Sequence, residues 1–123
     1  MNRARSWASV ADVEIKLRKV KSVTILDLEG ALLVGDPERD LRDRMNEAVG
    51  AGARRVAVNL ADVPYMDSSG IGALIRISNS VRQAGGRCQF YGATKKVRQL
   101  LKMVRLDTVL DLFEDEDSAL AAP

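Results

Sequence analysis

The run from Val56 to Leu60 places the strongest constraint on what this chain can fold into. It is short, rich in β-branched residues and lies between two segments with helical periodicity, which is typical of a central strand covered by helices. It leads into a polar turn, Asp67-Ser68-Ser69-Gly70, that opens the second helical segment. The chain is therefore expected to build an α/β sheet whose central strand delivers this turn to the start of a helix.

The segments before this strand predict a β-hairpin. Residues 13–19 and 23–28 alternate apolar and polar side chains, and Lys21-Ser22 lies between them. Such alternation around a short polar turn favours two antiparallel strands. A further short extended piece is expected at 31–34, after Gly30 interrupts the pattern.

Helical spacing and end signals predict the remaining elements. Asp36 is expected to cap the first helix, with Pro37 at its first position, and Thr94 to cap the third. The predicted helices cover 36–50, 69–84, 94–104 and 118–120, and two further strands cover 88–91 and 108–113. The expected fold class is α/β, a mixed sheet of four to five strands packed with about four helices, parallel in its middle and antiparallel at the hairpin edge.

The length of 123 residues fits one domain that buries its core without disulfides or metals. We expect a mobile N-terminal arm over 1–11, a domain over 12–118 and a C-terminal tail over 119–123. The acidic run 114–117 is expected to be solvated. Cys88 is the one cysteine, expected to be buried, and a chain so poor in cysteine fits a reducing compartment such as the cytoplasm.

Composition also excludes several classes of function. The chain has no histidine, which excludes Ser-His-Asp and Cys-His catalysis and zinc sites that need imidazole, and it has no phosphate-binding Gly-rich loop. Aromatic residues make up 4% and the net charge is +2, which argues against a nucleic-acid partner. We expect no enzymatic activity, no cofactor and no metal. One basic stretch is interpreted as a solvated helix face: Lys95, Lys96, Arg98, Lys102 and Arg105.

The polar turn admits two interpretations. A hydroxyl at the start of a helix can cap free backbone N–H groups, and the same N–H groups and the helix dipole favour an attached phosphate. Ser69 is expected to be the cap. Gly70 and Gly72 are expected to permit close packing of the helix on the sheet.

Residues 59–72, together with Gly85-Gly86 and the helical segment 97–101, resemble the STAS domain of bacterial anti-sigma factor antagonists over about residues 12–118. In that family a partner kinase, itself an anti-sigma factor, phosphorylates the hydroxyl residue directly after the aspartate. The resemblance implies Ser68 as the phosphorylation site, with Ser69 as the runner-up. It also implies a set of partner-binding residues: Asp67, Ser68, Ser69, Gly70, Ile71, Gly72 and Leu33.

The implied function is that of a cytoplasmic anti-sigma factor antagonist. It would bind a kinase of the histidine-kinase-like ATPase type while unphosphorylated, act as a monomer or weak dimer, and neither bind nucleic acid nor insert into a membrane. One turn departs from the family pattern, because Ala31 and Leu33 stand where many members carry Glu and Asp. The alternative is a STAS scaffold subunit that binds constitutively, in a signalling assembly or on a lipid-transport ATPase.

Overall fold

A computed structural model describes residues 13–122 of the chain. The predicted hairpin is present: β1 (Glu14–Val20) pairs antiparallel with β2 (Val23–Glu29). Lys21 lies in the turn between them in the left-handed region, at φ 58°, which lets two residues reverse the chain. The N-terminal arm expected over 1–11 lies outside the described residues.

The sheet continues from the hairpin with three parallel strands. β3 (Arg55–Asp62), β4 (Arg87–Tyr91) and β5 (Asp111–Phe113) follow β2 in the spatial order β1-β2-β3-β4-β5. Pairing of β2 with β3, of β3 with β4 and of β4 with β5 is parallel, and only the β1 edge is antiparallel. The predicted mixed sheet is therefore confirmed, with β3 at its centre as the apolar run indicated.

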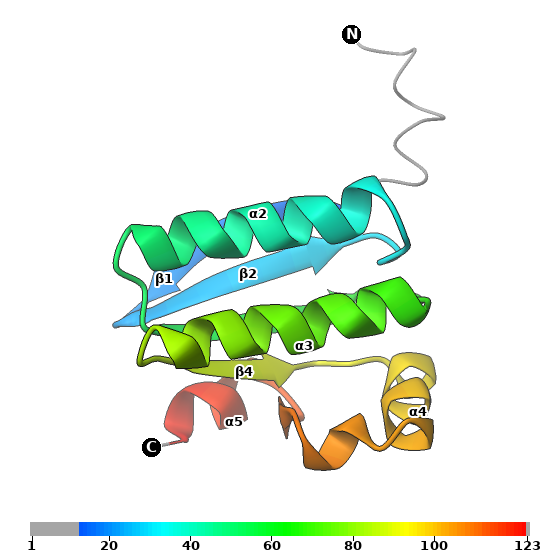
Figure 1. Ribbon diagram of the computed structural model, residues 1–123. Helices are drawn as coiled ribbons and strands as arrows, with labels where there is room; N and C mark the ends of the chain where they lie inside the picture. Colours follow the sequence, from blue (N-terminus) through cyan, green and yellow to red (C-terminus); the bar gives the residue numbers. More distant parts are fainter. Residues whose placement is uncertain (1–12, 123) are drawn as a thin grey trace, which may run out of the picture.

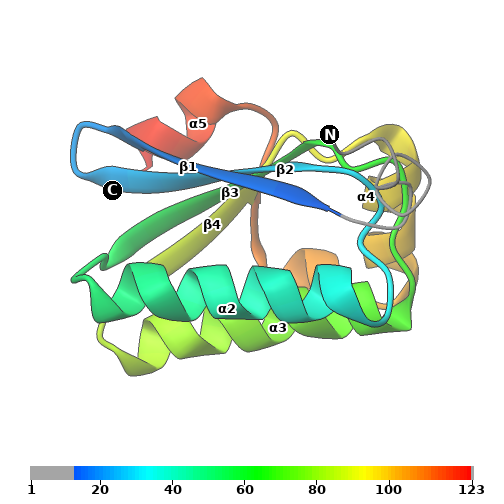
Figure 2. The same ribbon diagram turned by 90° about the horizontal axis from the view of Figure 1, so that it is seen from above.

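Helices cover the two faces unequally. α2 (Asp36–Gly50) and α3 (Ser68–Gln83) lie side by side on one face, and the short α5 (Glu116–Ala121) lies on the other (Figure 2). α4 (Lys95–Met103) and a 3-10 helix, η1 (Leu106–Thr108), connect β4 to β5 at the rim of the molecule (Figure 1). The strand expected over 108–113 is shorter because η1 occupies the segment before it.

Alternation along β3 explains the two faces. Val58 and its neighbours two residues away are fully buried in the main core beneath α2 and α3. Ala57 points to the opposite face, where it packs in a smaller cluster with Ala119 of α5. Because successive side chains of a strand point to opposite faces, one side of β3 packs against α2 and α3 and the other against α5.

One predicted cap is wrong. Asp36 is the first residue of α2 rather than its N-cap, and Pro37 is the second. The cap position belongs to Gly35, whose φ of 102° favours glycine, and no side chain caps this helix. The Asp36 carboxylate instead pairs with Arg39. Thr94 is confirmed as the cap of α4, since its hydroxyl accepts a hydrogen bond from the backbone N–H of Val97 at 3.2 Å.

Candidate functional site

Asp67 forms the N-cap of α3. Its backbone is extended, and its Oδ1 accepts a hydrogen bond from the backbone N–H of Gly70 at 3.0 Å. Ser68 is consequently the first helical residue and Ser69 the second. The expectation that Ser69 is the cap is wrong, because the carboxylate one position before Ser68 already reaches the third helical N–H.

The second oxygen of Asp67 fastens a neighbouring loop to the turn. Oδ2 accepts a hydrogen bond from the backbone N–H of Val34 at 3.0 Å. The main chain adds two contacts, Leu32 N to Tyr65 O at 2.9 Å and Asp67 N to Leu32 O at 3.3 Å. The extended piece predicted at 31–34 thus forms a single bridge to the chain before α3, between Leu32 and Met66.

The environment of Asp67 favours its charged form. Burial by itself acts to raise the pKa of this carboxyl, but backbone N–H donors from Gly70, Val34 and Ser69 outweigh it and hold the pKa below its ordinary value. Asp67 is thus an anionic clamp between helix and loop.

Gly70 is required by the close approach of α3 to this loop. A Cβ on Gly70 would lie 2.2 Å from the carbonyl oxygen of Leu32, a distance no side chain tolerates. Gly72 differs, since a Cβ there would meet only the guanidinium end of the Arg76 side chain, at 3.4 Å. The expectation of close packing is therefore corrected: Gly70 packs against a loop rather than the sheet, and Gly72 meets no backbone.

The structure separates the sequence-predicted residues by exposure. Ser68 is exposed, whereas Asp67 and Ser69 are half-buried. The remaining predicted residues are buried or half-buried: Gly70, Ile71, Gly72 and Leu33. Among the predicted set, Ser68 is the residue whose side chain is most accessible to another protein.

Two apolar residues that the sequence analysis did not select lie at the same turn. Val34 is 68% exposed and Tyr65 is 40% exposed. Nζ of Lys96 lies 5.2 Å from the centre of the Tyr65 ring, a cation–π geometry. The sequence signal that could have indicated these two residues is an apolar side chain within a polar loop, before α2 for Val34 and before α3 for Tyr65.

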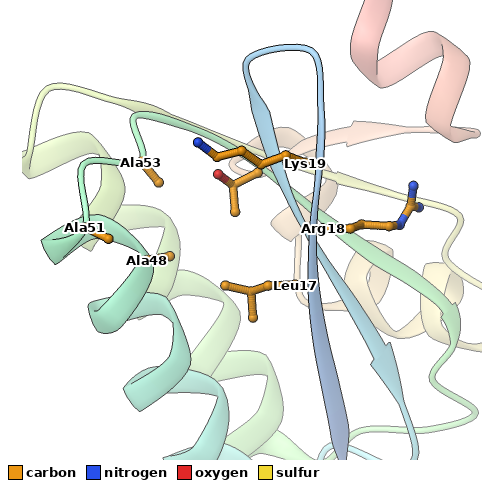
Figure 3. A pocket seen from close by; sticks show the side chains of 7 residues that line it. Leu17, Arg18, Lys19, Ala48, Ala51 and Ala53 are labelled. Carbon is orange, nitrogen blue, oxygen red and sulfur yellow. The ribbon is translucent and has the colours of Figure 1, made fainter.

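The hollow shown in Figure 3 lies at the other end of the helical layer. It has a volume of about 360 Å³ between β1 and the C-terminal end of α2, and its walls are mainly short or apolar side chains. Its lining residues are Leu17, Arg18, Lys19, Thr24, Ala48, Ala51 and Ala53. It holds neither a carboxylate nor a thiol.

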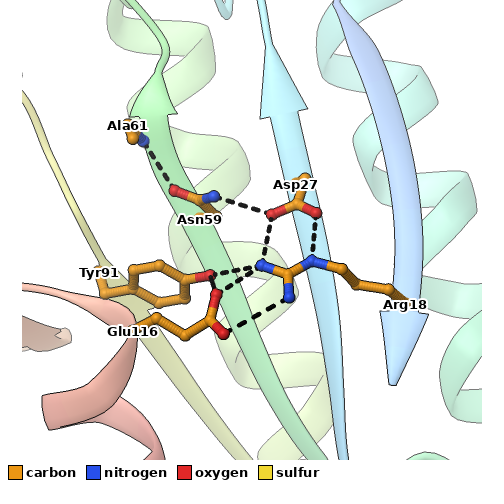
Figure 4. Close-up of polar contacts among 6 residues, drawn as sticks. All are labelled: Arg18, Asp27, Asn59, Ala61, Tyr91 and Glu116. Carbon is orange, nitrogen blue, oxygen red and sulfur yellow. Dashed lines mark hydrogen bonds and ion pairs between the residues drawn. The ribbon is translucent and has the colours of Figure 1, made fainter. Parts of the chain in front are cut away.

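A polar network on the opposite face holds α5 to the sheet (Figure 4). Arg18 Nε lies 2.6 Å from Asp27 Oδ2, and Arg18 Nη2 lies 2.5 Å from Glu116 Oε1. Tyr91 donates its hydroxyl to the same Glu116 oxygen at 2.7 Å, and Asn59 donates to Asp27 at 2.8 Å. The expectation that the acidic run is simply solvated is thus wrong for Glu116.

Charge pairing sets the titration of this network. Hydrogen bonding from Arg18 holds the pKa of both Asp27 and Glu116 below the ordinary range. Burial, followed by the bond to Glu116, raises the pKa of the Tyr91 phenol. Every acid in the network has a partner, as expected of a structural cluster.

Residues 13–122 contain neither a metal-type cluster of side chains nor a helix that could span a membrane. No cluster of three or more His, Cys, Asp or Glu side chains within that range could hold a metal ion. No helix in the same range is long and apolar enough to cross a membrane.

The chain belongs to the STAS domain family, whose model matches residues 14–119. Over 110 residues it is 26% identical to the anti-sigma F factor antagonist of Paenibacillus polymyxa. The match covers 89% of this chain and 93% of that protein.

Solved structures share the fold. An anti-sigma factor antagonist from Mycobacterium paratuberculosis superimposes with a TM-score of 0.77 at 15% identity, covering 89% of this chain and 92% of the other. The phosphorylated form of the Bacillus cell fate determinant SpoIIAA gives 0.65 at 19% identity, over 87% of this chain and 96% of the other. At these identities the likeness shows a common fold.

Proposed function

We propose that this chain is an anti-sigma factor antagonist that binds a kinase-type anti-sigma factor when Ser68 is unmodified and loses that affinity when Ser68 is phosphorylated. The observation that carries the proposal is the position of Ser68. Its side chain is exposed at the first residue of α3, directly after a capping carboxylate that is already engaged by Gly70 and Val34. Its similarity to the anti-sigma F factor antagonist of Paenibacillus polymyxa supports the assignment.

In the proposed phosphorylation this chain supplies only the hydroxyl group that accepts the phosphoryl group. The Ser68 hydroxyl oxygen would attack the γ-phosphorus of ATP bound to the partner, ADP would leave, and the hydroxyl proton would pass to a base on the partner. No catalytic group is needed here, in keeping with a regulatory protein of the cytoplasm. The product carries about 1.5 to 2 negative charges at the N-terminal end of a helix, where the helix dipole stabilises them.

Loss of affinity follows from the surface around Ser68. In the unmodified protein that surface combines a hydroxyl with the exposed Val34 and Tyr65 side chains. After phosphorylation, a partner that covers Val34 and Tyr65 would also have to desolvate a dianion beside Asp67. Asp67 holds the backbone of α3 and of the loop at Val34. Phosphorylation is therefore expected to change the charge of this surface and to leave its shape unchanged.

The acceptor residue is tested by mass spectrometry after incubation with candidate kinases and ATP. Ser68→Ala is expected to abolish phosphate incorporation, and Ser69→Ala is the matched control that retains it. A phosphate on Ser69, or none on the wild-type chain with any candidate kinase, contradicts the assignment of Ser68.

The same residue separates a switch from a constitutive scaffold. Ser68→Asp is expected to weaken binding to the kinase-type partner, measured by calorimetry, whereas Ser68→Ala keeps it. A partner whose affinity is unchanged by Ser68→Asp, for example a transporter ATPase recovered by pull-down, would support the scaffold subunit instead.

A further inference from the structure

The end of α4 and its connection to β5 expose three large apolar side chains. Met103 is 79% exposed, Val104 49% and Val109 57%. All three lie in the segment 103–109, which we call the α4 tip, at the rim of the molecule (Figure 1). An exposed apolar patch is a typical feature of a surface that contacts a protein or a membrane.

The tip is held firmly in this exposed position. Val97 and Leu101 on the inner side of α4 are fully buried, and Leu106 in η1 is buried as well. Val109 N and Leu110 N both donate to the Leu106 carbonyl, at 3.0 and 2.8 Å. The exposure of Met103 therefore belongs to the folded state and does not come from fraying of the helix end.

Met103 also lies on the polar side of its helix. It follows Lys96 by seven residues and Gln99 by four, which places all three on one face. A methionine at this position adds nothing to the core, so its apolar surface is free for an outside contact.

Cations lie along α4 and at the tip. Five exposed basic residues lie on α4 and at its end, and Asp107 is the one acid between residues 95 and 110. None of the five forms an ion pair within the described residues, whereas Arg18, Arg76 and Arg87 elsewhere do. The five are Lys95, Lys96, Arg98, Lys102 and Arg105.

We propose that the α4 tip docks on the surface of a membrane that contains anionic lipids. The cations lie against phosphate headgroups, and Met103, Val104 and Val109 enter the interface between headgroups and acyl chains. Clusters of four to eight Lys or Arg beside exposed apolar residues have the chemistry for such a surface. The excess of five cations over one acid between residues 95 and 110 matches the negative charge of such headgroups.

The proposed docking surface is separate from the Ser68 turn. Lys96 in the first turn of α4 contacts Tyr65, and Met103 ends the helix about 10 Å further along its axis. Docking is centred on Lys102 and Arg105, the cations that flank Met103 and Val104 in the sequence, so either proposal can fail alone.

Co-sedimentation of the purified chain with vesicles tests the electrostatic part. Binding is expected to vesicles of phosphatidylcholine mixed with phosphatidylglycerol at low salt, to weaken as salt rises, and to be absent with phosphatidylcholine alone. The double variant Lys102→Gln with Arg105→Gln is expected to lower the partition about 25-fold, at about fivefold per cation. Lys16→Gln with Lys19→Gln removes equal charge from β1 and is expected to change the partition by less than about twofold.

A fluorescent label tests insertion of the apolar residues. Met103→Cys carrying an environment-sensitive dye is expected to shift to the blue with anionic vesicles, and Val34→Cys with the same dye is expected to stay unshifted. The native Cys88 is buried, so labelling is directed to the introduced cysteine. Any one of three results overturns the proposal: no vesicle binding at low salt, an equal loss in both double variants, or an unshifted dye at position 103. If the tip binds an acidic protein and not vesicles, the proposal is overturned as well.

Discussion

At the scale of single residues, the two glycines at the start of α3 have opposite roles. Gly70→Ala is expected to destabilise the protein by about 2 kcal/mol, because the new Cβ collides with the Leu32 carbonyl and forces the loop away. Gly72→Ala is the matched control. Its Cβ meets only the end of Arg76, so the substitution is expected to stabilise by about 0.5 to 1 kcal/mol through better helix propensity. Urea denaturation measures both, and equal effects would contradict the close approach at Gly70.

Asp67 has two separable roles, as the cap of α3 and as the acceptor for the loop at Val34. Asp67→Ala removes both the cap of α3 and the bond to Val34, and we expect a loss of about 1 to 2 kcal/mol in the free energy of unfolding. Asp67→Asn keeps one acceptor oxygen, so it is expected to retain the cap at Gly70 and lose the contact with the loop. Thermal denaturation compares the two, and amide exchange at Val34 should rise in both. Slow exchange at Val34 in Asp67→Ala would contradict the clamp.

At the scale of elements, α5 depends on polar contacts more than on its own apolar surface. Only Ala119 of this six-residue helix is fully buried, and Arg55 donates to the carbonyls of Ala119 and Leu120 in the helix and of Ala122 just after it. Tyr91→Phe removes the hydroxyl that donates to Glu116. We expect it to lower the free energy for local opening of α5 by about 1 kcal/mol.

Hydrogen exchange measures this opening. Amides over 116–121 are expected to exchange faster in Tyr91→Phe, while amides in α3 keep their protection because the main core is untouched. A uniform increase across both helices would indicate a global loss of stability and contradict a local role for the network.

At the scale of the whole molecule, stability is expected to fall on acidification. The folded-state pKa values of Asp27, Asp67 and Glu116 all lie below their ordinary values. Each carboxylate therefore contributes stability above its unfolded pKa, near about 4, and loses it as pH falls through the folded value. Urea midpoints measured between neutral and acidic pH check this.

The contribution of the polar network to this acid sensitivity can be isolated. In Asp27→Asn the loss of stability below about pH 4 should be shallower, because one of the carboxylates with a depressed pKa is gone. Tyr91, whose pKa is raised, adds a loss of stability on the alkaline side as pH rises above about 10. A slope in acid that is the same in Asp27→Asn and wild type would contradict the pairing with Arg18.

The order and type of most elements follow from the sequence alone. The strand 56–60, the hairpin and the helix starting near Ser69 follow from apolar periods of two and 3.6 residues, which depend only on neighbours along the chain. The family resemblance rested on the same local stretch, since the polar turn and its flanks are contiguous.

Which side chains act together depends on how the elements pack in the folded protein. Asp67 rather than Ser69 caps α3, and its second oxygen reaches Val34, 33 residues earlier. Arg18 and Glu116 meet across 98 residues, and Met103 is exposed because the helix it ends lies at the rim of the sheet. Such contacts depend on how separately specified elements approach one another, and no local period encodes that approach.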